Sequence, residues 1–512
     1  MKVAIYDKWL NSLGGGEKVA TVMAEVLVKR GHEVHLISNF EVEKHQLEEK
    51  MGVNLSKIKL IVWYERSYAK LTLKTKKYDL FINVSFLDHL PSKARNSVFY
   101  IHFPTPVKST LLGFIKYETI LPHLRKFLII PEVQSGINPI DDVYTRGGRW
   151  LSKKNTVIFS NTPTNFNLTL RIYAEQLSLK TLEKVNFNSP NASTTLLDRY
   201  IDHEFNVLVY KLKISSPGQN PAVRILVNEN LRTNALGLVS MTVRDFRFVL
   251  WNFIKRYMPR YEMALYGSGA YKVGQGLDTY KLFLANSAFT SYWTKKYWRK
   301  DSKILYPPVD TKSFKPGKKR NIILNVGRFF VGGHSKRQDI LVATFKKMVD
   351  THKIDNTWEL TFVGGIAGGK DHSDYVNKIR EESRGYPINF YFSASFKILR
   401  ELYSQARIYW HATGYEANEN IDPIKLEHFG ITPVEAMAAG VVPLVYEAGG
   451  LTETVGGDTN LTWKSQEELI SKTTKIIKNP KLLTKLSREV VGNAKKFSKE
   501  NFAKRFASYL DL

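Results

Sequence analysis

The sequence Glu427-His-Phe-Gly-Ile-Thr-Pro-Val-Glu435 places two carboxylates eight positions apart around a glycine. Thr432 is a type preferred at helix N-caps, Pro433 suits a first helical position, and mainly apolar residues follow. We therefore expect a buried helix to begin near Pro433. Its unpaired N–H groups would form a positive terminus that can hold a phosphate, and the two carboxylates can accept hydroxyl protons from a sugar or ribose.

A purely structural alternative is a capping box, because Thr432 and Glu435 have its spacing and Glu435 would then only close the start of the helix. Two observations favour a ligand site. Glu427 lies too far upstream to cap this helix, and the helix is followed by the strand-like run 441–445 and by Gly449-Gly450. The pattern indicates a binding site at the helix start and leaves the cap open as its alternative.

This segment resembles the retaining glycosyltransferases of family 4 (group 1), whose characteristic motif is Glu, seven residues, Glu. The resemblance implies the α/β fold called GT-B, with two Rossmann-like domains, a cleft between them and here an insertion in the N-terminal domain. It also implies that Glu427 contacts the transferred sugar and Glu435 the ribose of the nucleotide. The helix terminus at Gly430, Ile431 and Thr432 would then face the leaving group of the donor.

Composition limits the class of protein. With 512 residues, 43% of them hydrophobic, the chain can form two or more domains with sizeable cores. No stretch approaches the roughly 20 consecutive apolar residues of a spanning helix, and Met1 to Tyr6 has the pattern of a strand instead of a signal peptide. We therefore expect a cytoplasmic protein. The absence of cysteine excludes disulfides, thiolate catalysis and cysteine-ligated metals.

The net charge of +27 predicts attraction to an anionic partner, such as a nucleotide diphosphate, a phospholipid surface or a nucleic acid. The basic residues are spread along the chain without a recognisable nucleic-acid-binding motif. Nucleic acid is therefore not the expected partner. A basic nucleic-acid-binding protein, or a non-catalytic scaffold of the same fold, remains the alternative to an enzyme.

The N-terminal region alternates strands and helices. A strand at 3–6, glycines at 14–16, an amphipathic helix at 17–30 that stops at Gly31, and a strand at 33–38 form a βαβ unit. Val19 occupies the last position of the dinucleotide pattern G-x-G-x-x-G, so NAD or FAD binding is poorly supported. The glycines either form a plain tight turn or let the backbone of Gly15 and Gly16 approach the donor phosphates or the acceptor.

A candidate catalytic residue, His102, comes directly after the expected strand 97–101 and before a proline-containing loop. Ligands gather at the carboxyl ends of strands in open α/β sheets, whereas a lone histidine is more often structural. The glycine-rich start and the His-x-Pro-Thr loop resemble the ALG-eleven-type mannosyltransferases of family 4. That resemblance implies a lipid-linked oligosaccharide acceptor, and it places His102 beside the reacting sugar.

Residues from about 163 to 284 interrupt the alternation with short strand-like segments, which predict an insertion with β character. Its last part, Arg244 to Arg260, interleaves aromatic and basic residues. This segment is either a helix at a membrane interface or an ordinary buried helix with a solvated basic edge. The insertion is also a candidate surface for a partner or for another copy of the chain.

A second domain is expected from Lys312, with Arg328 at a strand end and Lys336 at a helix start. Family 4 enzymes usually carry an Arg and a Lys here that neutralise the leaving diphosphate, but the lengthened loop leaves Lys336 and Arg337 as alternatives for the Lys. No Asp-x-Asp motif for a metal occurs in the chain. We expect no cofactor and activity without a divalent metal.

The predicted domains are 1–311 for the acceptor, with the insertion at about 163–284, then 312–493 for the nucleotide sugar, and a terminal helix in 494–512 that crosses back to the first domain. The expected function is a retaining glycosyltransferase that moves a hexose to a lipid-linked or other glycan acceptor. Mannose from GDP-mannose is favoured by the resemblance. The charge and the substrate class together predict a peripheral place on the inner face of a membrane.

Overall fold

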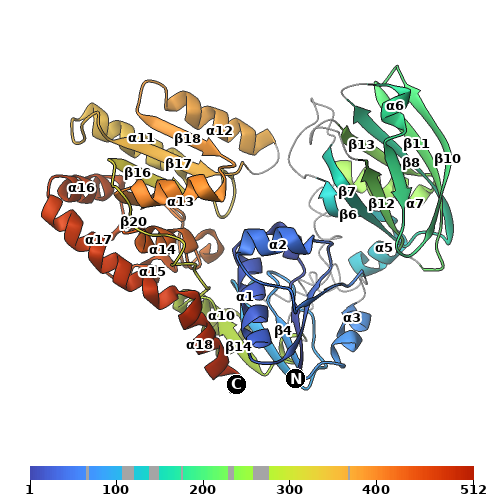
Figure 1. Ribbon diagram of the computed structural model, residues 1–512, viewed down its shortest axis with the longest axis horizontal. Helices are drawn as coiled ribbons and strands as arrows, with labels where there is room; N and C mark the ends of the chain where they lie inside the picture. The colour runs from blue at the N-terminus through green and yellow to red at the C-terminus, as the bar shows by residue number, and fades with distance from the viewer. Residues whose placement is uncertain are drawn as a thin grey trace. The chain divides into compact units, whose positions relative to one another are not determined.

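The structure is a computed structural model that describes residues 1–64, 68–106, 120–137, 149–174, 177–218, 220–228, 236–257, 276–366 and 370–511 (Figure 1). Its contacts divide the chain into two compact units. The first unit comprises residues 1–13, 32–97 and 107–281, and the second comprises residues 14–31, 98–106 and 282–512. The domain limits expected from the sequence stay predictions.

The first unit contains four parallel strands in the order β4-β1-β2-β3. They are β1 (Lys2–Tyr6), β2 (Glu33–Ser38), β3 (Lys59–Val62) and β4 (Leu80–Asn83), accompanied by the helices α2 (Lys44–Met51) and α3 (Tyr68–Thr75). The central strands are almost continuously apolar and buried, as expected where both faces of a parallel sheet are covered. The strands expected at 3–6 and 33–38 are thus present.

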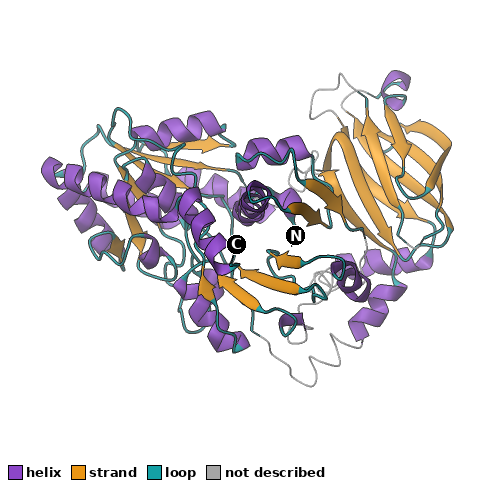
Figure 2. Cartoon of the chain, turned by 60° about the horizontal axis from the view of Figure 1, so that its bottom comes forward, coloured by secondary structure: helices purple, strands orange, loops and turns teal. Residues whose placement is uncertain are grey.

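The first unit also contains a large antiparallel sheet, which Figure 2 shows as a broad twisted layer. Its order is β10-β11-β8-β13-β7-β12-β9, and β6 pairs with β7. The strands are β6 (Ile130–Ile137), β7 (Arg149–Ser160), β8 (Asn165–Ala174), β9 (Val185–Asn188), β10 (Ser193–Asp202), β11 (Val207–Ser215), β12 (Ala222–Val227) and β13 (Leu236–Val243). Two of them, β6 and β7, precede position 163.

Short helices accompany this sheet, namely α5 (Leu121–Phe127), α6 (Leu179–Leu182) and α7 (Phe246–Tyr257). Buried residues alternate with more exposed ones along β8 and in the second half of β11, so one face of the sheet forms a core. Phe248, Trp251 and Ile254 of α7 belong to the same core. The expected helix within 244–260 therefore exists with a buried face, and Arg260 lies outside the described residues.

A buried carboxylate, Glu41, fastens the antiparallel sheet to the segment after β2. It accepts hydrogen bonds from the hydroxyls of Tyr64 (2.5 Å) and Thr156 (2.8 Å) and from the guanidinium of Arg224 (2.9 Å). Burial alone would raise the pKa of Glu41, but these hydrogen bonds outweigh burial and hold the pKa below its usual value. A single charged group thus links residues that are far apart in the chain.

The second unit contains a six-stranded parallel sheet in the order β18-β17-β16-β19-β20-β21. Its strands are β16 (Ile322–Val326), β17 (Glu359–Gly364), β18 (Ile388–Phe392), β19 (Ile408–His411), β20 (Val442–Tyr446) and β21 (Thr462–Trp463). The associated helices are α11 (Gln338–Asp350), α12 (Lys370–Glu382), α13 (Phe396–Gln405), α14 (Ile431–Ala438), α15 (Leu451–Thr454), α16 (Gln466–Ile477) and α17 (Pro480–Ala494). This is a Rossmann-like α/β arrangement, with polar loops at the carboxyl ends of its strands.

The same unit includes α1 (Gly15–Lys29), α10 (Ala288–Trp298), α18 (Lys499–Tyr509) and three parallel strands in the order β15-β14-β5. These strands are β5 (Asn96–Ile101), β14 (Leu282–Ala285) and β15 (Lys303–Ile304). The C-terminal helix α18 contacts α1 and buries Phe502 and Phe506. The second unit therefore brings together the helix α1 with its N-terminal glycines, the end of β5 and the C-terminal region.

Among the residues that the structure describes, no helix is both long and apolar enough to cross a bilayer.

Candidate functional site

The helix at the centre of the predicted site, α14, begins at Ile431, two residues before the start expected at Pro433. Gly430, with a φ of 95°, occupies the N-cap position, and Thr432 is inside the helix. The prediction of a Thr432 cap is wrong because only glycine adopts this left-handed conformation without strain. No side chain of the described residues caps α14, so its first N–H groups face a site that an anion can occupy.

The glycine pair after β20 packs directly against the first carboxylate's backbone. A methyl group added at Gly449 would lie 2.6 Å from the carbonyl oxygen of Glu427, and one added at Gly450 would lie 2.1 Å from that of His428. The backbone N–H of Gly450 donates a hydrogen bond of 2.8 Å to the carbonyl of Glu427. The Gly449-Gly450 pair noted in the sequence therefore holds Glu427 in place.

Glu427 forms a short ion pair with Lys336. Nζ of Lys336 donates to Oε2 of Glu427 at 2.5 Å, and the two side chains are only 22% and 16% exposed. Nε2 of His411, at the end of β19, lies 3.5 Å from the same oxygen, which is an electrostatic contact and not a formed hydrogen bond. A carboxylate, an ammonium and a buried imidazole thus meet at the carboxyl edge of the six-stranded sheet.

The charges around Glu427 determine its protonation. Burial alone would raise the pKa of Glu427, but the charge of Lys336 outweighs burial and keeps the pKa well below its usual range. Burial also lowers the pKa of His411, against the attraction of Glu427. At neutral pH the site therefore holds a charged carboxylate beside a neutral imidazole.

The second carboxylate, Glu435, lies about one turn into α14, and its environment differs from that of Glu427. The hydroxyl of Tyr403 donates to its Oε2 at 3.1 Å, and the hydroxyl of Tyr409 donates to Oγ1 of Thr432 at 2.8 Å. Burial raises the pKa of Glu435, and the charge of Lys18 on α1 offsets this only in part. Glu435 takes no part in a capping box, so the structural alternative considered for the motif does not apply.

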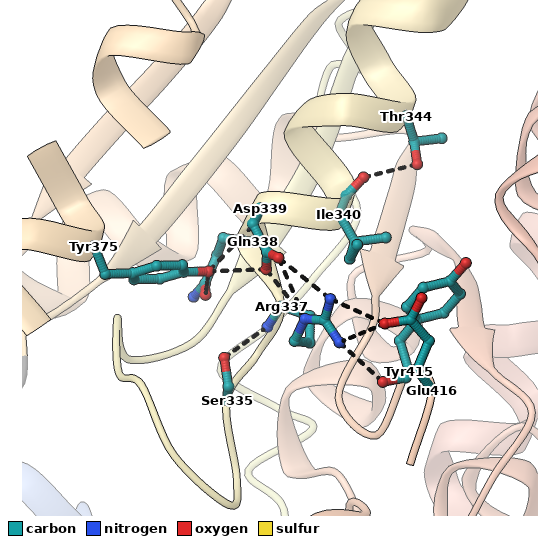
Figure 3. Close-up of polar contacts among 9 residues, drawn as sticks. All are labelled: Ser335, Arg337, Gln338, Asp339, Ile340, Thr344, Tyr375, Tyr415 and Glu416. Carbon is teal, nitrogen blue, oxygen red and sulfur yellow. Dashed lines mark hydrogen bonds and ion pairs between the residues drawn. The ribbon is translucent and has the colours of Figure 1, made fainter. Parts of the chain in front are cut away.

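The two candidate cations after the lengthened loop have different partners. Figure 3 shows the guanidinium of Arg337 held between Asp339 and the backbone carbonyl of Tyr415, to which it donates at 3.0 Å. Arg337 also pairs with Glu416 at 3.4 Å. Lys336, and not Arg337, contacts Glu427. Arg328 is exposed, and its charge acts on the nearby His334, whose pKa is lowered chiefly by burial.

The N-terminal glycines and His102 lie at the same site as α14, within the second unit. A methyl group added at Gly15 would lie 2.9 Å from Cδ1 of Ile431, and one added at Gly16 would lie 3.2 Å from Cε1 of His102. Asn286 donates a hydrogen bond of 2.9 Å to the carbonyl of His102 and so anchors the residue that follows β5. The close approach to Ile431 and His102 explains why the start of α1 carries glycines.

An aromatic stack that the sequence analysis did not identify lines the site. The ring of His428 lies flat on Phe103, with centroids 4.0 Å apart and planes at 8°, and meets the edge of His334 at 4.5 Å. Burial holds the pKa of His428 well below its usual value, so the ring is neutral. Nε2 of this ring is buried without a hydrogen-bond partner in the described part of the chain.

Two of the residues missed by sequence analysis, His411 and His428, had partial signals. His411 ends a strand, just as His102 follows one, and the same rule about strand ends applies to both. His428 lies inside the Glu427 to Glu435 motif. Phe103 and Lys18 had no signal, because only the tertiary structure brings them to α14.

The geometry thus groups most predicted site residues around the start of α14. Glu427, Lys336 and Glu435 surround a helix terminus with open N–H groups, and Gly15, Gly16 and His102 approach it from other segments of the second unit. Such a terminus with an adjacent ammonium can bind a diphosphate, and the carboxylates can accept hydrogen bonds from hydroxyl groups. The assignment of individual roles to these residues is a proposal.

A scan against protein families matches residues 309–497 to the model described as "Glycosyl transferases group 1". Similar curated proteins include GDP-Man:Man(3)GlcNAc(2)-PP-Dol alpha-1,2-mannosyltransferases. The protein from Dictyostelium discoideum is 28% identical over 45% of this chain, and that from Homo sapiens is 26% identical over 33% of it. The matches cover 47% and 34% of those two proteins, so the chain aligns with at most about half of their length.

A solved structure that resembles the whole chain is that of HepE from Anabaena in complex with UDP and glucose. It has a TM-score of 0.52 and 12% sequence identity, and the alignment covers 100% of this chain and 99% of that one. At this identity the likeness concerns the fold alone. The resemblance predicted from the sequence is confirmed: the chain has the GT-B fold of two Rossmann-like domains, and residues 309–497 match the group 1 glycosyltransferases.

Proposed function

We propose that this chain is a retaining glycosyltransferase that transfers a hexose, with mannose favoured, from a nucleotide sugar to a lipid-linked glycan. The observation that carries the proposal is the pair of Lys336 and Glu427, 2.5 Å apart beside the open N-terminus of α14. A positive helix terminus, a cation and a carboxylate are the groups needed to hold the diphosphate and the sugar of such a donor.

The departing nucleoside diphosphate develops negative charge, which must be stabilised as the bond to the sugar breaks. Lys336 has three N–H donors, so it can keep Glu427 and still contact a phosphoryl oxygen. Arg328 and the N–H groups of Ile431 and Thr432 supply further positive potential. Each cation about 4 Å from the leaving oxygen contributes roughly 4 kcal/mol at an effective dielectric of about 20. Under this proposal the reaction proceeds without a metal.

The sugar and the ribose are assigned to the two carboxylates. Glu427 accepts hydrogen bonds from sugar hydroxyls, and its low pKa keeps it a charged acceptor. Glu435, joined to Tyr403, is the partner for the ribose. His102 is placed beside the acceptor by the resemblance to the family, and Gly16 packs against its ring without a side chain, where a methyl group would lie 3.2 Å away. No covalent nucleophile is assigned. The incoming hydroxyl attacks from the face that the diphosphate leaves, which retains the anomeric configuration.

The substrate class is supported by the relatives. Their names specify GDP-mannose as donor and a dolichyl diphosphate oligosaccharide as acceptor, with an alpha-1,2 linkage. We carry over GDP-mannose as the favoured donor and a polyprenyl or dolichyl diphosphate glycan as the acceptor. A lipid-linked acceptor and a net charge of +27 both favour a peripheral place on the inner, anionic face of a membrane.

A thermal-shift comparison of GDP, UDP, ADP and their sugars tests the donor site. A ligand at a hundred times its dissociation constant stabilises the protein by about 2.7 kcal/mol. GDP-mannose should raise the melting temperature most, and Lys336→Ala should reduce that rise. The matched control is Lys353→Ala, an exposed lysine away from the site. If no nucleotide raises the melting temperature, the proposal is wrong.

The reaction itself is tested with GDP-mannose and a polyprenyl diphosphate oligosaccharide. The product should have the alpha configuration of the donor, as determined by NMR, and Glu427→Gln should abolish its formation. The alternative function makes a different prediction. A nucleic-acid-binding protein would bind DNA with an affinity that falls steeply with salt and that survives both Glu427→Gln and Lys336→Ala.

A further inference from the structure

The helix α7 exposes a continuous apolar stripe in addition to its buried face. Phe246, Val249, Phe253 and Tyr257 are 68%, 63%, 52% and 62% exposed. Their spacing of three, four and four residues places them along one side of the helix. Phe253 and Tyr257 contact each other, with ring centroids 4.9 Å apart. This stripe is separate from the face formed by Phe248, Trp251 and Ile254, which already supplies the helix with its core contacts.

The stripe continues onto α5, a second helix of the same unit. The ring of Phe127, 43% exposed, meets that of Phe246 edge to face at 5.7 Å. At the other end of α5, Ile120 is 56% exposed. Two helices that are far apart in the sequence therefore present apolar side chains to the same surroundings. A contiguous exposed patch of this kind marks an interaction surface more often than scattered single residues do.

Within the described helices α5 and α7, the charged residues are basic. Arg244 lies just before α7, Lys255 and Arg256 lie in its last turn, and Lys126 is next to Phe127; all four are exposed. The sequences of α5 and α7 contain no acidic residue. The adjacent acid, Asp245, is already bound by Arg247 at 2.7 Å. The surface is thus aromatic with a basic border.

We propose that this surface, the stripe of α7 continued by Phe127 of α5, docks onto the headgroup layer of an anionic lipid bilayer. Aromatic side chains enter the boundary between headgroups and acyl chains, and lysine and arginine pair with lipid phosphates and carboxylates. A second copy of the chain fits less well, because two basic surfaces would face each other and each chain carries a net charge of +27. The inference rests on the proposed function only in that a lipid-linked acceptor requires a membrane.

The test is flotation of the full chain with vesicles of phosphatidylcholine alone or of phosphatidylcholine mixed with phosphatidylserine. The wild-type chain should bind the mixed vesicles more strongly, and added salt should weaken the binding. Phe246→Ser with Phe253→Ser should lower the binding constant for the mixed vesicles about tenfold or more. The pair Lys255→Gln with Arg256→Gln should have the same effect.

Matched controls lie elsewhere in the same antiparallel sheet region. Leu197 and Phe205 are 53% and 57% exposed, so Leu197→Ser with Phe205→Ser removes a similar apolar area. Lys180→Gln with Lys213→Gln removes the same charge from other exposed positions. Both control pairs should leave vesicle binding unchanged. All variants should keep their melting temperature and its rise with GDP-mannose, which separates loss of docking from loss of folding or of the donor site.

Three outcomes would overturn the proposal. The first is equal binding of the stripe variants and the control variants. The second is the absence of vesicle binding by a wild-type chain that still responds to GDP-mannose, which would leave the proposed enzyme intact and remove only the docking surface. The third is a change of oligomeric state, measured by sedimentation, in the stripe variants without any change in vesicle binding, which would assign the surface to a second copy of the chain.

Discussion

Glu427 and Glu435 are eight positions apart in the sequence, yet the protein treats their charges in opposite ways. The ion pair with Lys336 keeps the pKa of Glu427 well below its usual range despite burial. Burial raises the pKa of Glu435, and Tyr403 and Lys18 do not fully compensate. The first carboxylate therefore stabilises the folded protein when charged, whereas the second destabilises it, as is common for groups that serve a ligand.

Opposite effects on stability should follow from neutralising the two residues. Near neutral pH, Glu427→Gln should lower the free energy of unfolding and Glu435→Gln should raise it. The gain from Glu435→Gln should vanish below pH about 4.5, where the wild-type carboxyl is protonated in both states. The loss from Glu427→Gln should fade only as the pH falls further, through the depressed folded pKa. Thermal unfolding across this pH range measures both, and effects of the same sign would contradict the assignment.

Lys336 and Arg337 are neighbours, but only one of them faces Glu427. Lys336→Ala should weaken the binding of GDP about tenfold or more, since a hydrogen bond to a charged group contributes about 1.5 to 3 kcal/mol. Arg337→Ala should instead lower stability, because it leaves Asp339 and Glu416 without their cation. Titration calorimetry with GDP and thermal unfolding separate the two effects. Weaker GDP binding in Arg337→Ala with unchanged binding in Lys336→Ala would reverse the assignment.

At the scale of elements, the turn after β20 controls the position of the first carboxylate. Gly449 has a φ of 60°, and a methyl group there would press on the carbonyl of Glu427. Gly457 has a similar φ of 73° but open space around it. Gly449→Ala should therefore reduce kcat/KM about a hundredfold, as a displacement near 1 Å does in other active sites. Gly457→Ala should cost only the backbone strain of about 1 kcal/mol, with kcat/KM unchanged. Equal kinetic effects would remove this role of the turn.

The antiparallel sheet of the insertion is held to the segment after β2 through Glu41. Glu41→Gln keeps the shape of the side chain but leaves Arg224 without a charged partner, and it should lower the free energy of unfolding by about 2 kcal/mol. Glu43→Gln is the matched control, because Glu43 is exposed and its pair with Lys154 contributes at most about 1 kcal/mol. Urea unfolding measures both variants. Similar losses in the two would show that Glu41 is not the anchor.

At the scale of the whole molecule, the proposed chemistry depends on side chains and a helix terminus to stabilise the leaving diphosphate. Transfer from GDP-mannose should therefore persist in excess EDTA, with kcat reduced less than about twofold, whereas loss of one stabilising donor costs about a hundredfold. Restoration by added Mg²⁺ or Mn²⁺ after loss in EDTA would show that a metal is required. Lys336→Ala assayed under the same conditions provides the reference for a damaged site.

Local patterns account for much of the fold. The strands β1, β2 and β5, the helix α1 and the helix that starts after Gly430 were all expected from apolar periodicity and glycine punctuation, because these signals depend on near neighbours in the chain. The start of α14 was misplaced by two residues, since the left-handed backbone of Gly430 is chosen by its packing against Leu451 and Glu427. For α7 the sequence left two readings open, a helix at a membrane interface and a buried helix, as periodicity alone does not tell an exposed apolar side from a buried one.

The sequence by itself determined the α/β class, the motif from Glu427 to Glu435 and the presence of His102 and Lys336 at element ends, since each depends on local chemistry and spacing. Only the tertiary structure decided that Lys336 and not Arg337 meets Glu427, that Gly16 lies against His102, and that His428 stacks on Phe103. These contacts join segments separated by tens to hundreds of residues. Their formation depends on how burial and charge are shared across the folded chain, which no single stretch of sequence contains.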